Sequence, residues 1–243
     1  MKLLVSVVDA AEARAAAAAG ADIVDVKNPA EGSLGAPSPG VIDAVRAAVP
    51  AGVPVSAAIG DMPDLPGTAA LAAFGAAHSG AAFVKVGLWG VSTETEALAL
   101  LRAVREAVAR VPGAVVVAGA YADAARVAHA PLAPELLPEV AQAAGVEVCL
   151  LDTAIKDGRG LLDWRSPDEL ASLVDDAHRA GLRVALAGAL RAEDLPVVGA
   201  TGADIAGVRS AACGDDRRSG PLEPARVRAL RAACAAATPR ASR

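Results

Sequence analysis

The sequence predicts a single closed (β/α)8 barrel, of the TIM-barrel type. The chain has 243 residues, which is close to the usual length of this fold. Eight short apolar runs alternate along it with eight alanine-rich segments whose apolar residues have a helical spacing. The apolar runs are continuous rather than alternating with polar residues, as expected of parallel strands that are covered on both faces.

The expected strands are built from Val, Leu, Ile and Ala. The first four have the sequences LLVSVV, DIVDVK, VPVSAAIG and AFVKVGL, at residues 3–8, 22–27, 53–60 and 82–88. The last four have the sequences AVVVAGAY, VCLLDT, RVALAG and DIAGVR, at residues 114–121, 148–153, 183–188 and 204–209.

A segment with helical periodicity follows each of these strands. The eight segments lie at residues 10–20, 38–50, 68–80, 93–110, 133–145, 166–181, 191–202 and 223–237. Many of them have Ser, Thr or Asp before the first turn or end in Gly, which are ordinary start and stop residues of helices. The alanine tract at residues 15–19 lies between two strands, so we interpret it as the small-residue face of a helix.

No linker or change of composition marks a domain boundary, so we expect one domain over residues 1–235. Residues 236–243 are expected to form a frayed tail, as chain ends commonly do. A doubly wound parallel sheet is the alternative fold. It is disfavoured because the segment after the first strand, SVVDAAEA, contains no glycine-rich dinucleotide-binding turn.

The composition argues against several classes of function. The net charge is −5 and aromatic residues make up 2% of the chain, whereas nucleic-acid-binding proteins favour basic faces and stacking rings. No apolar run approaches the roughly 18 residues of a membrane span. Asp9 ends the first apolar run too early for a signal peptide. We therefore expect a cytoplasmic protein without a nucleic-acid or membrane partner.

The cysteines and histidines predict neither a disulfide nor a metal site. Cys149, Cys213 and Cys234 are widely spaced, and the three histidines are scattered along the chain. Metal centres need ligands at convergent spacings. We therefore expect free thiols and no bound metal.

The chain has only four lysines against nineteen arginines. Lys27 ends the second expected strand, Lys85 lies inside the fourth and Lys156 follows the sixth. Reactive groups in this fold come from the C-terminal ends of the strands, so we expect these three amines to converge at one mouth of the barrel. Arginine cannot replace lysine as an amine nucleophile, because guanidinium keeps its proton.

Carboxylates accompany these lysines. Asp25 lies two positions before Lys27, so both point to the same face of a strand, and Asp152 ends the sixth strand. A desolvated lysine near other cations can lose its proton and attack a carbonyl, while carboxylates hold ammonium groups and transfer protons. An adjacent carboxylate opposes that activation, so Lys85 or Lys156 must outweigh Asp25, or Asp25 must act mainly in proton transfer. The alternative is a structural cluster of ion pairs at the rim.

The last two expected strands end in glycine-rich segments, ALAGAL around Gly188 and GVRSAAC from Gly207. Loops after the seventh and eighth strands of this fold commonly bind phosphate through backbone N–H groups. Arg209 and Ser210 could add side-chain donors, and Asp123 is a further candidate for contact with the substrate. The alternative is that the glycines serve tight turns only. Together with the lysines, this pattern predicts a Schiff-base enzyme that acts on a small phosphosugar.

The motifs that contain these residues resemble those of a known family. The stretches GADIVDVKNPAEGSLGA, VKVGLWGV, LLDTAIKDGRGLLDW and DIAGVRSAAC are similar to (5-formylfuran-3-yl)methyl phosphate synthases, and the likeness covers roughly residues 2–234. The resemblance implies a TIM-barrel lyase that condenses two molecules of glyceraldehyde 3-phosphate, with loss of phosphate and water, into a phosphorylated furan. That furan is a precursor of methanofuran, a one-carbon carrier.

The resemblance also implies roles for particular residues. The lysine of DVKNP, Lys27, would form the Schiff base, and the lysine of VKVGL, Lys85, would be the proton acceptor. Asp25, Asp152 and Lys156 match the rest of the family's polar pocket. Since an imine is itself an electron sink, no metal or organic cofactor is expected.

Two other functions are left open by the sequence. A Schiff-base aldolase that acts on another phosphosugar would use the same lysines, and a non-catalytic barrel that binds a phosphometabolite would have the same pocket. The lysines disfavour the second, because a binding protein could use arginine for every phosphate. A metal-dependent aldolase would need clustered histidines and carboxylates. Association into a homo-oligomer through small-residue helix faces is also left open.

Overall fold

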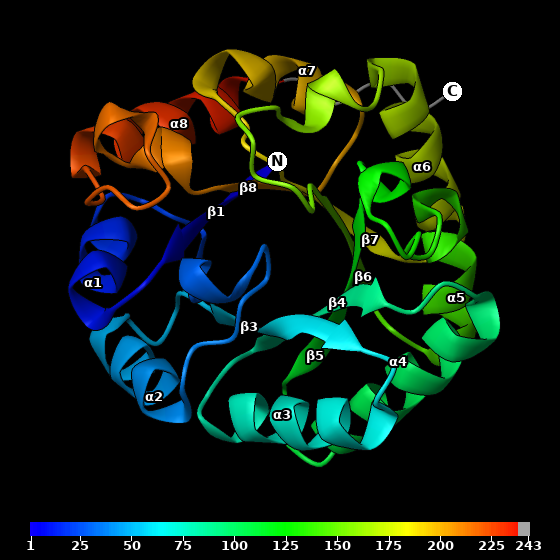
Figure 1. Cartoon of the computed structure of the whole chain (residues 1–243). Helices are drawn as coiled ribbons and strands as arrows, with labels where there is room; N and C mark the ends of the chain where they lie inside the picture. Colours follow the sequence, from blue (N-terminus) through cyan, green and yellow to red (C-terminus); the bar gives the residue numbers. More distant parts are fainter. Residues whose placement is uncertain (238–243) are drawn as a thin grey trace.

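The computed structural model describes residues 1–237 as a closed barrel of parallel strands, in the order β1 to β8, inside a ring of helices (Figure 1). The expected fold class is therefore confirmed. The strands are β1 (Lys2–Val7), β2 (Ile23–Val26), β3 (Val55–Pro63), β4 (Phe83–Gly90), β5 (Val115–Tyr121), β6 (Val148–Asp152), β7 (Arg183–Leu186) and β8 (Ile205–Val208). The helices are α1 (Ala10–Ala18), α2 (Pro39–Ala48), α3 (Pro66–His78), α4 (Glu94–Val108), α5 (Leu137–Ala144), α6 (Pro167–Arg179), α7 (Leu195–Ala200) and α8 (Pro224–Ala236).

Two helices begin later than the helical periodicity indicates. The α-helices expected over residues 133–145 and 191–202 start only at Leu137 and Leu195, each after a short 3-10 turn. Both have a proline in the first turn, a position where proline is favoured because no intrahelical N–H group is needed there.

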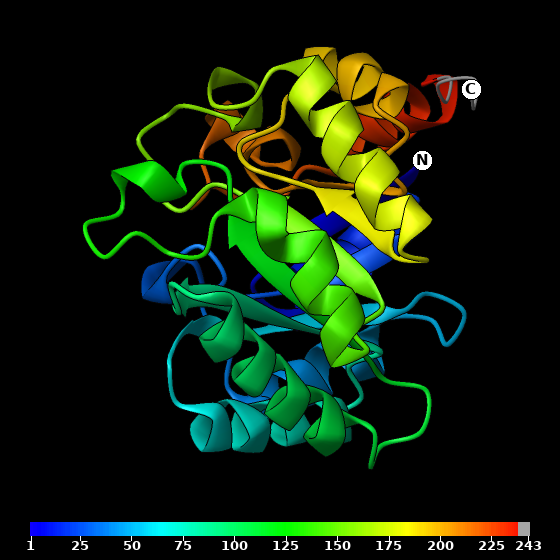
Figure 2. The same ribbon diagram turned by 90° about the vertical axis from the view of Figure 1, so that its right-hand side faces the viewer.

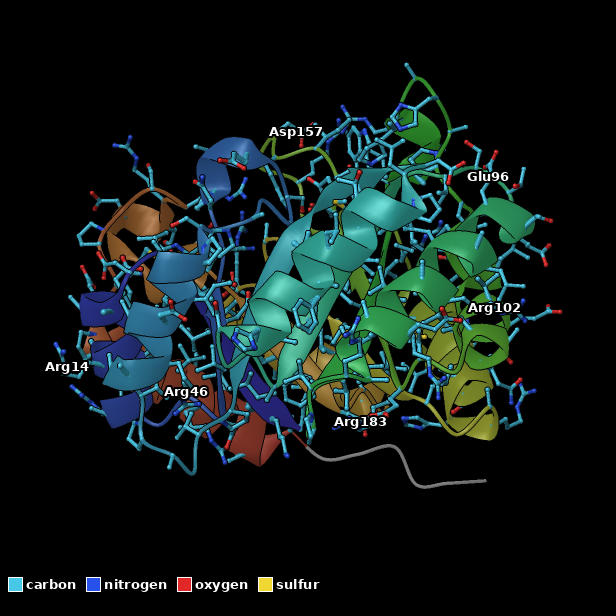
Figure 3. All side chains as sticks on the ribbon, turned by 90° about the horizontal axis from the view of Figure 1, so that it is seen from below. Arg14, Arg46, Glu96, Arg102, Asp157 and Arg183 are labelled. Carbon is cyan, nitrogen blue, oxygen red and sulfur yellow. The ribbon has the colours of Figure 1, made fainter. Side chains whose placement is uncertain are left out.

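The two ends of the barrel are distinct. Figure 3 shows Asp157, in the loop after β6, at the opposite end of the molecule from Arg46 and Arg183. In Figure 2 the long green connection after β5 protrudes on one side, and the N-terminus lies towards the other. Among residues 1–237, no helix has both the length and the apolar character that a membrane crossing requires. Of the tail expected at 236–243, the first residue ends α8 and the last six lie outside the described residues.

Strand β3 is longer than the strand expected at 53–60 and is irregular. Its pairing with β4 shifts register between Ala58 and Asp61 and again between Asp61 and Pro63. Gly60 lies in this stretch with φ of +120°, a conformation that favours glycine. Irregularities of this kind redirect side chains. Here Asp61 is directed towards the chain that connects β2 to α2.

The connection between β2 and α2, residues 27–38 (the β2–α2 segment), lies inside the ring of helices in Figure 1. Its Leu34 is buried in the interior of the barrel with Ile23 and Val117. A Cβ atom at Gly119 of β5 would lie 2.9 Å from Leu34 Cδ1. The absence of a side chain at Gly119 thus lets the leucine enter the barrel.

Asp61 fixes the β2–α2 segment in place. Its carboxylate accepts hydrogen bonds from the N–H groups of Ser33 at 2.7 Å and Leu34 at 3.2 Å, and from the Tyr121 hydroxyl. Burial and the Asp61 charge raise the pKa of Tyr121 well above its ordinary value, so this hydroxyl remains a donor. Ser33 Oγ donates in turn to the Thr153 carbonyl at 2.8 Å, which joins the segment to the end of β6.

We predict that Gly87→Ala destabilises the fold. A Cβ atom at Gly87 of β4 would collide with the Tyr121 hydroxyl and lie 2.9 Å from Asp61 Oδ1, so the buried pair must separate. Overpacking of this kind costs about 1–3 kcal/mol. Gly75→Ala is the matched control, because nothing lies within 4 Å of a Cβ atom there and alanine inside a helix gains roughly 0.5–1 kcal/mol. Urea unfolding curves measure both; equal stabilities would contradict the prediction.

Candidate active site

A cavity of about 300 Å³ opens among the loops that follow the strands and extends into the barrel. Its walls contain Lys27, Lys85 and Lys156 together with Asp25 and Asp152. The structure therefore brings all the expected catalytic residues into one site. The deeper wall is formed by apolar side chains of the barrel interior: Leu4, Ile23, Phe83, Val117, Val148, Leu150 and Ile205.

Lys85 and Asp25 form a buried ion pair. Lys85 Nζ lies 2.7 Å from both carboxylate oxygens and donates a hydrogen bond to Oδ2. Ser6 Oγ donates to the same oxygen at 2.8 Å. Asp25 Oδ1 is buried and, apart from its 2.7 Å ion-pair contact with Lys85 Nζ, has no hydrogen-bond partner among the described residues. This oxygen can therefore still accept a hydrogen bond from a proton donor that enters the cavity.

Lys156 and Asp152 form a second ion pair nearer the mouth. Lys156 Nζ lies 2.8 Å from Asp152 Oδ1 and also donates to the carbonyl and hydroxyl oxygens of Thr153. Burial alone would raise the pKa of Asp152, but the charges of Lys156 and Lys27 and the hydrogen bonds from Lys156 and the Thr153 N–H group outweigh it and lower that pKa to about 2. Asp152 is therefore ionised at neutral pH.

Lys27 is left without a carboxylate partner. It follows β2, where its backbone N–H group donates to the Val7 carbonyl at 3.1 Å. Among the described residues its Nζ has one hydrogen bond, to the Ser33 carbonyl at 3.5 Å, a distance at which the bond is weak. Within residues 1–237 no carboxylate lies within 4 Å of this amine, whereas the other two lysines of the cavity are paired.

The environment of Lys27 favours its neutral form. Burial has the largest effect and lowers the pKa of Lys27. The charges of Asp152 and Asp25 raise this pKa, those of Lys85 and Lys156 lower it, and the resulting pKa is about 8. Asp25 is the weakest of these influences. The opposition expected from the adjacent carboxylate is therefore small, and desolvation rather than repulsion between the lysines accounts for most of the effect.

Two serines of the site were not predicted from the sequence. Ser6 of β1 and Ser56 of β3 are both in register with Asp25 of β2, and both line the cavity. Ser56 Oγ is buried and lacks a hydrogen-bond partner among the described residues. A polar residue inside an otherwise apolar strand, at the same level as Asp25, was the feature that could have identified them.

Three of the residues expected to bind phosphate lie where the sequence analysis placed them. Gly188, Gly207 and Ser210 line the cavity at the ends of β7 and β8. Ala189 also lines it and, like Gly188, has a positive φ, of +49° against +112°. The backbone N–H groups of Gly188, Ala189 and Ser210 donate no hydrogen bond within the described part of the chain. These N–H groups remain available to an anion.

Arg209 lines the cavity, but its guanidinium is already engaged. It forms an ion pair with Glu12 of α1 and donates to the carbonyls of Ser6, Arg218 and Gly220. These contacts occupy all three of its nitrogens. The geometry therefore gives Arg209 a structural role in place of the expected phosphate contact.

Asp123 does not line the cavity. Its buried carboxylate accepts hydrogen bonds from the backbone N–H groups of Ala154 at 2.6 Å and Ile155 at 2.9 Å. It thereby shapes the loop that carries Lys156. The structure thus places Asp123 beneath the site instead of against the substrate.

Other charged residues of the site were missed from the sequence. Arg159 and Arg218 line the cavity, and Asp61 holds the β2–α2 segment. Arg218 lies in the stretch GDDRRSG, where nothing in the sequence distinguishes it from Arg217. Asp61 follows a glycine at the end of an apolar run, but the sequence does not show that the strand continues through it.

The described residues offer no cluster of three or more His, Cys, Asp or Glu side chains that could hold a metal ion. All three cysteines are free and buried. Burial raises the pKa of Cys149 to about 12 and that of Cys234 to about 11, so neither thiol is a nucleophile at neutral pH.

Solved structures of known proteins share this barrel. A crystal structure of 3-hexulose-6-phosphate synthase from Salmonella typhimurium has a TM-score of 0.66 at 20% identity, covering 97% of this chain and 99% of that one. KGPDC from Streptococcus mutans has a TM-score of 0.64 at 15% identity, covering 97% and 98%. At these identities the likeness concerns the fold alone.

Sequence relatives are much closer. The (5-formylfuran-3-yl)methyl phosphate synthase of Methanocaldococcus jannaschii is 49% identical over 236 residues, which cover 96% of this chain and 100% of the relative. That of Methanopyrus kandleri is 50% identical and covers 96% and 99%. A Streptomyces griseus protein, named provisionally for the same activity, is 50% identical and covers 96% and 94%.

A family model agrees with these relatives. The model described as 4-HFC-P synthase matches residues 3–231, which include every residue that lines the cavity. The resemblance found in the motifs is thereby confirmed, and the chain belongs to the (5-formylfuran-3-yl)methyl phosphate synthase (4-HFC-P synthase) family.

Proposed function

We propose that this protein is a cytoplasmic lyase that condenses two molecules of glyceraldehyde 3-phosphate into (5-formylfuran-3-yl)methyl phosphate through a Schiff base on Lys27. One observation carries the proposal: a buried amine, without a carboxylate partner among residues 1–237, lies in the same cavity as two lysine–aspartate ion pairs. The names of the relatives support the product. An aldehyde substrate is supported by the chemistry of an amine nucleophile.

The first step is attack of Lys27 Nζ on the aldehyde carbon of one triose phosphate. A C–N bond forms, water leaves, and the protonated imine withdraws electrons from the adjacent carbon. Lys27 is 7% exposed and shares its cavity with apolar side chains. Limited access of water favours the neutral amine before the attack and protects the imine from early hydrolysis.

Proton transfer next to the imine falls to Lys85 and Asp25. Lys85 Nζ donates a hydrogen bond to Asp25 in the ion pair, which suits it to the role of a donor. Asp25 Oδ1, which accepts no hydrogen bond among the described residues, is the nearest acceptor we assign to the proton on carbon. The resemblance implies that Lys85 is the proton acceptor. We assign this role to the Lys85–Asp25 pair, in which Asp25 accepts the proton and Lys85 donates one to a developing oxyanion.

The resulting enamine attacks the aldehyde carbon of the second triose phosphate and forms a C–C bond. Elimination of one phosphate, ring closure and loss of water give the furan, and hydrolysis of the imine returns the Lys27 amine. Lys156 and Asp152, nearer the mouth, supply a second donor and acceptor for the eliminations. A Schiff-base aldolase that acts on another phosphosugar would use the same first steps, so identification of the product separates the two.

We predict that Lys27→Arg abolishes turnover of glyceraldehyde 3-phosphate. Arginine retains the positive charge but cannot form an imine. Borohydride reduction in the presence of substrate should add a triose to the Lys27 peptide of the wild type, read by mass spectrometry, and none to the variant. Lys2→Arg is the matched control, because Lys2 is exposed at the start of β1, and it should retain full activity.

Two outcomes would contradict the proposal at different levels. A fully active Lys27→Arg variant would exclude the Schiff base. An adduct on Lys27 without formation of a furan from glyceraldehyde 3-phosphate alone would retain the Schiff base and favour the aldolase.

The pH dependence of Lys27 is a separate prediction. With a pKa of about 8, roughly one amine in ten is neutral at pH 7, against about three in ten thousand at the ordinary value. Trace acetylation of Lys27 by acetic anhydride should therefore rise as the pH passes through 8. Asp152→Asn removes a charge that raises the pKa and should move this midpoint down, whereas Lys156→Met removes a charge that lowers it and should move the midpoint up.

The signs of the two shifts make this test specific. A wild-type midpoint near that of a lysine in an unfolded peptide, or shifts in the reverse directions, would show that the cavity does not activate the amine. Peptide mapping by mass spectrometry follows Lys27 separately from the other lysines.

A further inference from the structure

We propose that Arg218 binds the phosphate group of the substrate, in a site that it forms with the backbone N–H groups of Gly188, Ala189 and Ser210. The inference rests on the proposed function for the identity of the substrate and deepens it by naming the side chain that selects phosphorylated trioses. Sequence reasoning assigned this role to Arg209, which the structure engages elsewhere.

Arg218 has donors to spare at the wall of the cavity. It lies in the connection from β8 to α8, is half-buried and lines the cavity. Its Nη2 donates to the Gly32 carbonyl at 2.5 Å, and within residues 1–237 its side chain has no other hydrogen bond and no ion pair. A guanidinium has five N–H donors, so most of those of Arg218 are free.

Arg159 and Lys156, two other cationic side chains of the cavity wall, are committed to carboxylates. Arg159 contacts Asp157 through two nitrogens and stacks on Trp164, with its guanidinium carbon 4.3 Å from the ring centroid. Lys156 is paired with Asp152. Of the arginines that line the cavity in the described chain, Arg218 is therefore the one that can meet an anion without losing a partner.

Arg209 holds the segment that carries Arg218. Its Nε donates to the Arg218 carbonyl at 3.0 Å and its Nη2 to the Gly220 carbonyl at 3.2 Å, while Glu12 balances its charge. On the other side, the Arg218 side chain reaches the β2–α2 segment at Gly32. Arg218 is thus fixed from both sides, and less freedom is lost when it binds a ligand.

The backbone donors lie on the same wall. Gly188 and Ala189 are consecutive residues with positive φ, and such a stretch can direct successive N–H groups towards one anion. Glycine is required at 188, since a Cβ atom there would lie 2.9 Å from Thr153 Cγ2. Ser210 begins a 3-10 turn after β8, so its N–H group has no intrahelical acceptor. Neutral N–H donors and one arginine suit a phosphate.

The test compares Arg218→Gln with Arg217→Gln. Glutamine at 218 removes the charge and leaves a shorter, polar side chain. Arg217 is the exposed neighbour and does not line the cavity, so it is the matched control. Three quantities are measured on the full chain: the affinity for inorganic phosphate by calorimetry, the KM for glyceraldehyde 3-phosphate, and the borohydride-trapped adduct of Lys27 with unphosphorylated glyceraldehyde.

Arg218→Gln should weaken binding of inorganic phosphate and raise KM by about ten- to a hundredfold, which corresponds to the loss of charge-assisted hydrogen bonds. The glyceraldehyde adduct should be unchanged, because that aldehyde has no phosphate. Arg217→Gln should behave as the wild type in all three measurements.

Unchanged phosphate affinity in Arg218→Gln, or an equal loss in Arg217→Gln, would overturn the assignment. So would a lost glyceraldehyde adduct in Arg218→Gln, since the residue would then act on the amine or on the fold. Failure of the proposed function would give a different result. The wild type would form no Lys27 adduct with either aldehyde, while the phosphate titration would still measure the contribution of Arg218.

Discussion

The site depends on an uneven pairing of buried charges. Three amines share one cavity with Asp25, Asp152 and Asp216. Asp25 is paired with Lys85, Asp152 with Lys156 and Asp216 with Arg226, so each of these carboxylates already has a partner. A protonated Lys27 would add an unpaired positive charge to a poorly solvated site, which is unfavourable. Loss of its proton removes that charge, so burial lowers the pKa. Activation of one lysine is therefore a consequence of how the other two are paired.

Burial of Lys27 depends in turn on the β2–α2 segment. Ser33 supplies the one hydrogen-bond acceptor that the described part of the chain offers to the amine. The same residue is held by Asp61 and by the end of β6. Leu34 places an apolar side chain inside the barrel. A segment anchored at a neighbouring strand, at a distant strand and in the core has little freedom to open, and its rigidity keeps water from the amine. The glycines that leave room for this segment therefore contribute to the reactivity of Lys27.

The sequence predicts features that repeat along the chain or involve a rare residue type. It does not predict features that depend on contacts between residues far apart in the chain. The strands and Lys27 were found because apolar runs recur and lysine is rare here. The ion pair of Arg209 could not be predicted because its partner, Glu12, lies 197 residues away in the chain. Asp61 was missed because an irregularity in β3 directs it. Arg218 was missed because a loop of several charged residues does not show which of them faces a cavity.

The choice of arginine at the cavity wall follows from the charge balance around Lys27. A substrate phosphate brings negative charge, which raises the pKa of a nearby amine in the way that Asp152 does. A cation that binds the phosphate offsets this effect. A lysine there could itself lose its proton in the cavity, whereas guanidinium remains charged. Arg218 would thus neutralise the substrate at one side of the cavity while Lys27 stays reactive at the other, which accounts for the division between lysines that react and an arginine that binds.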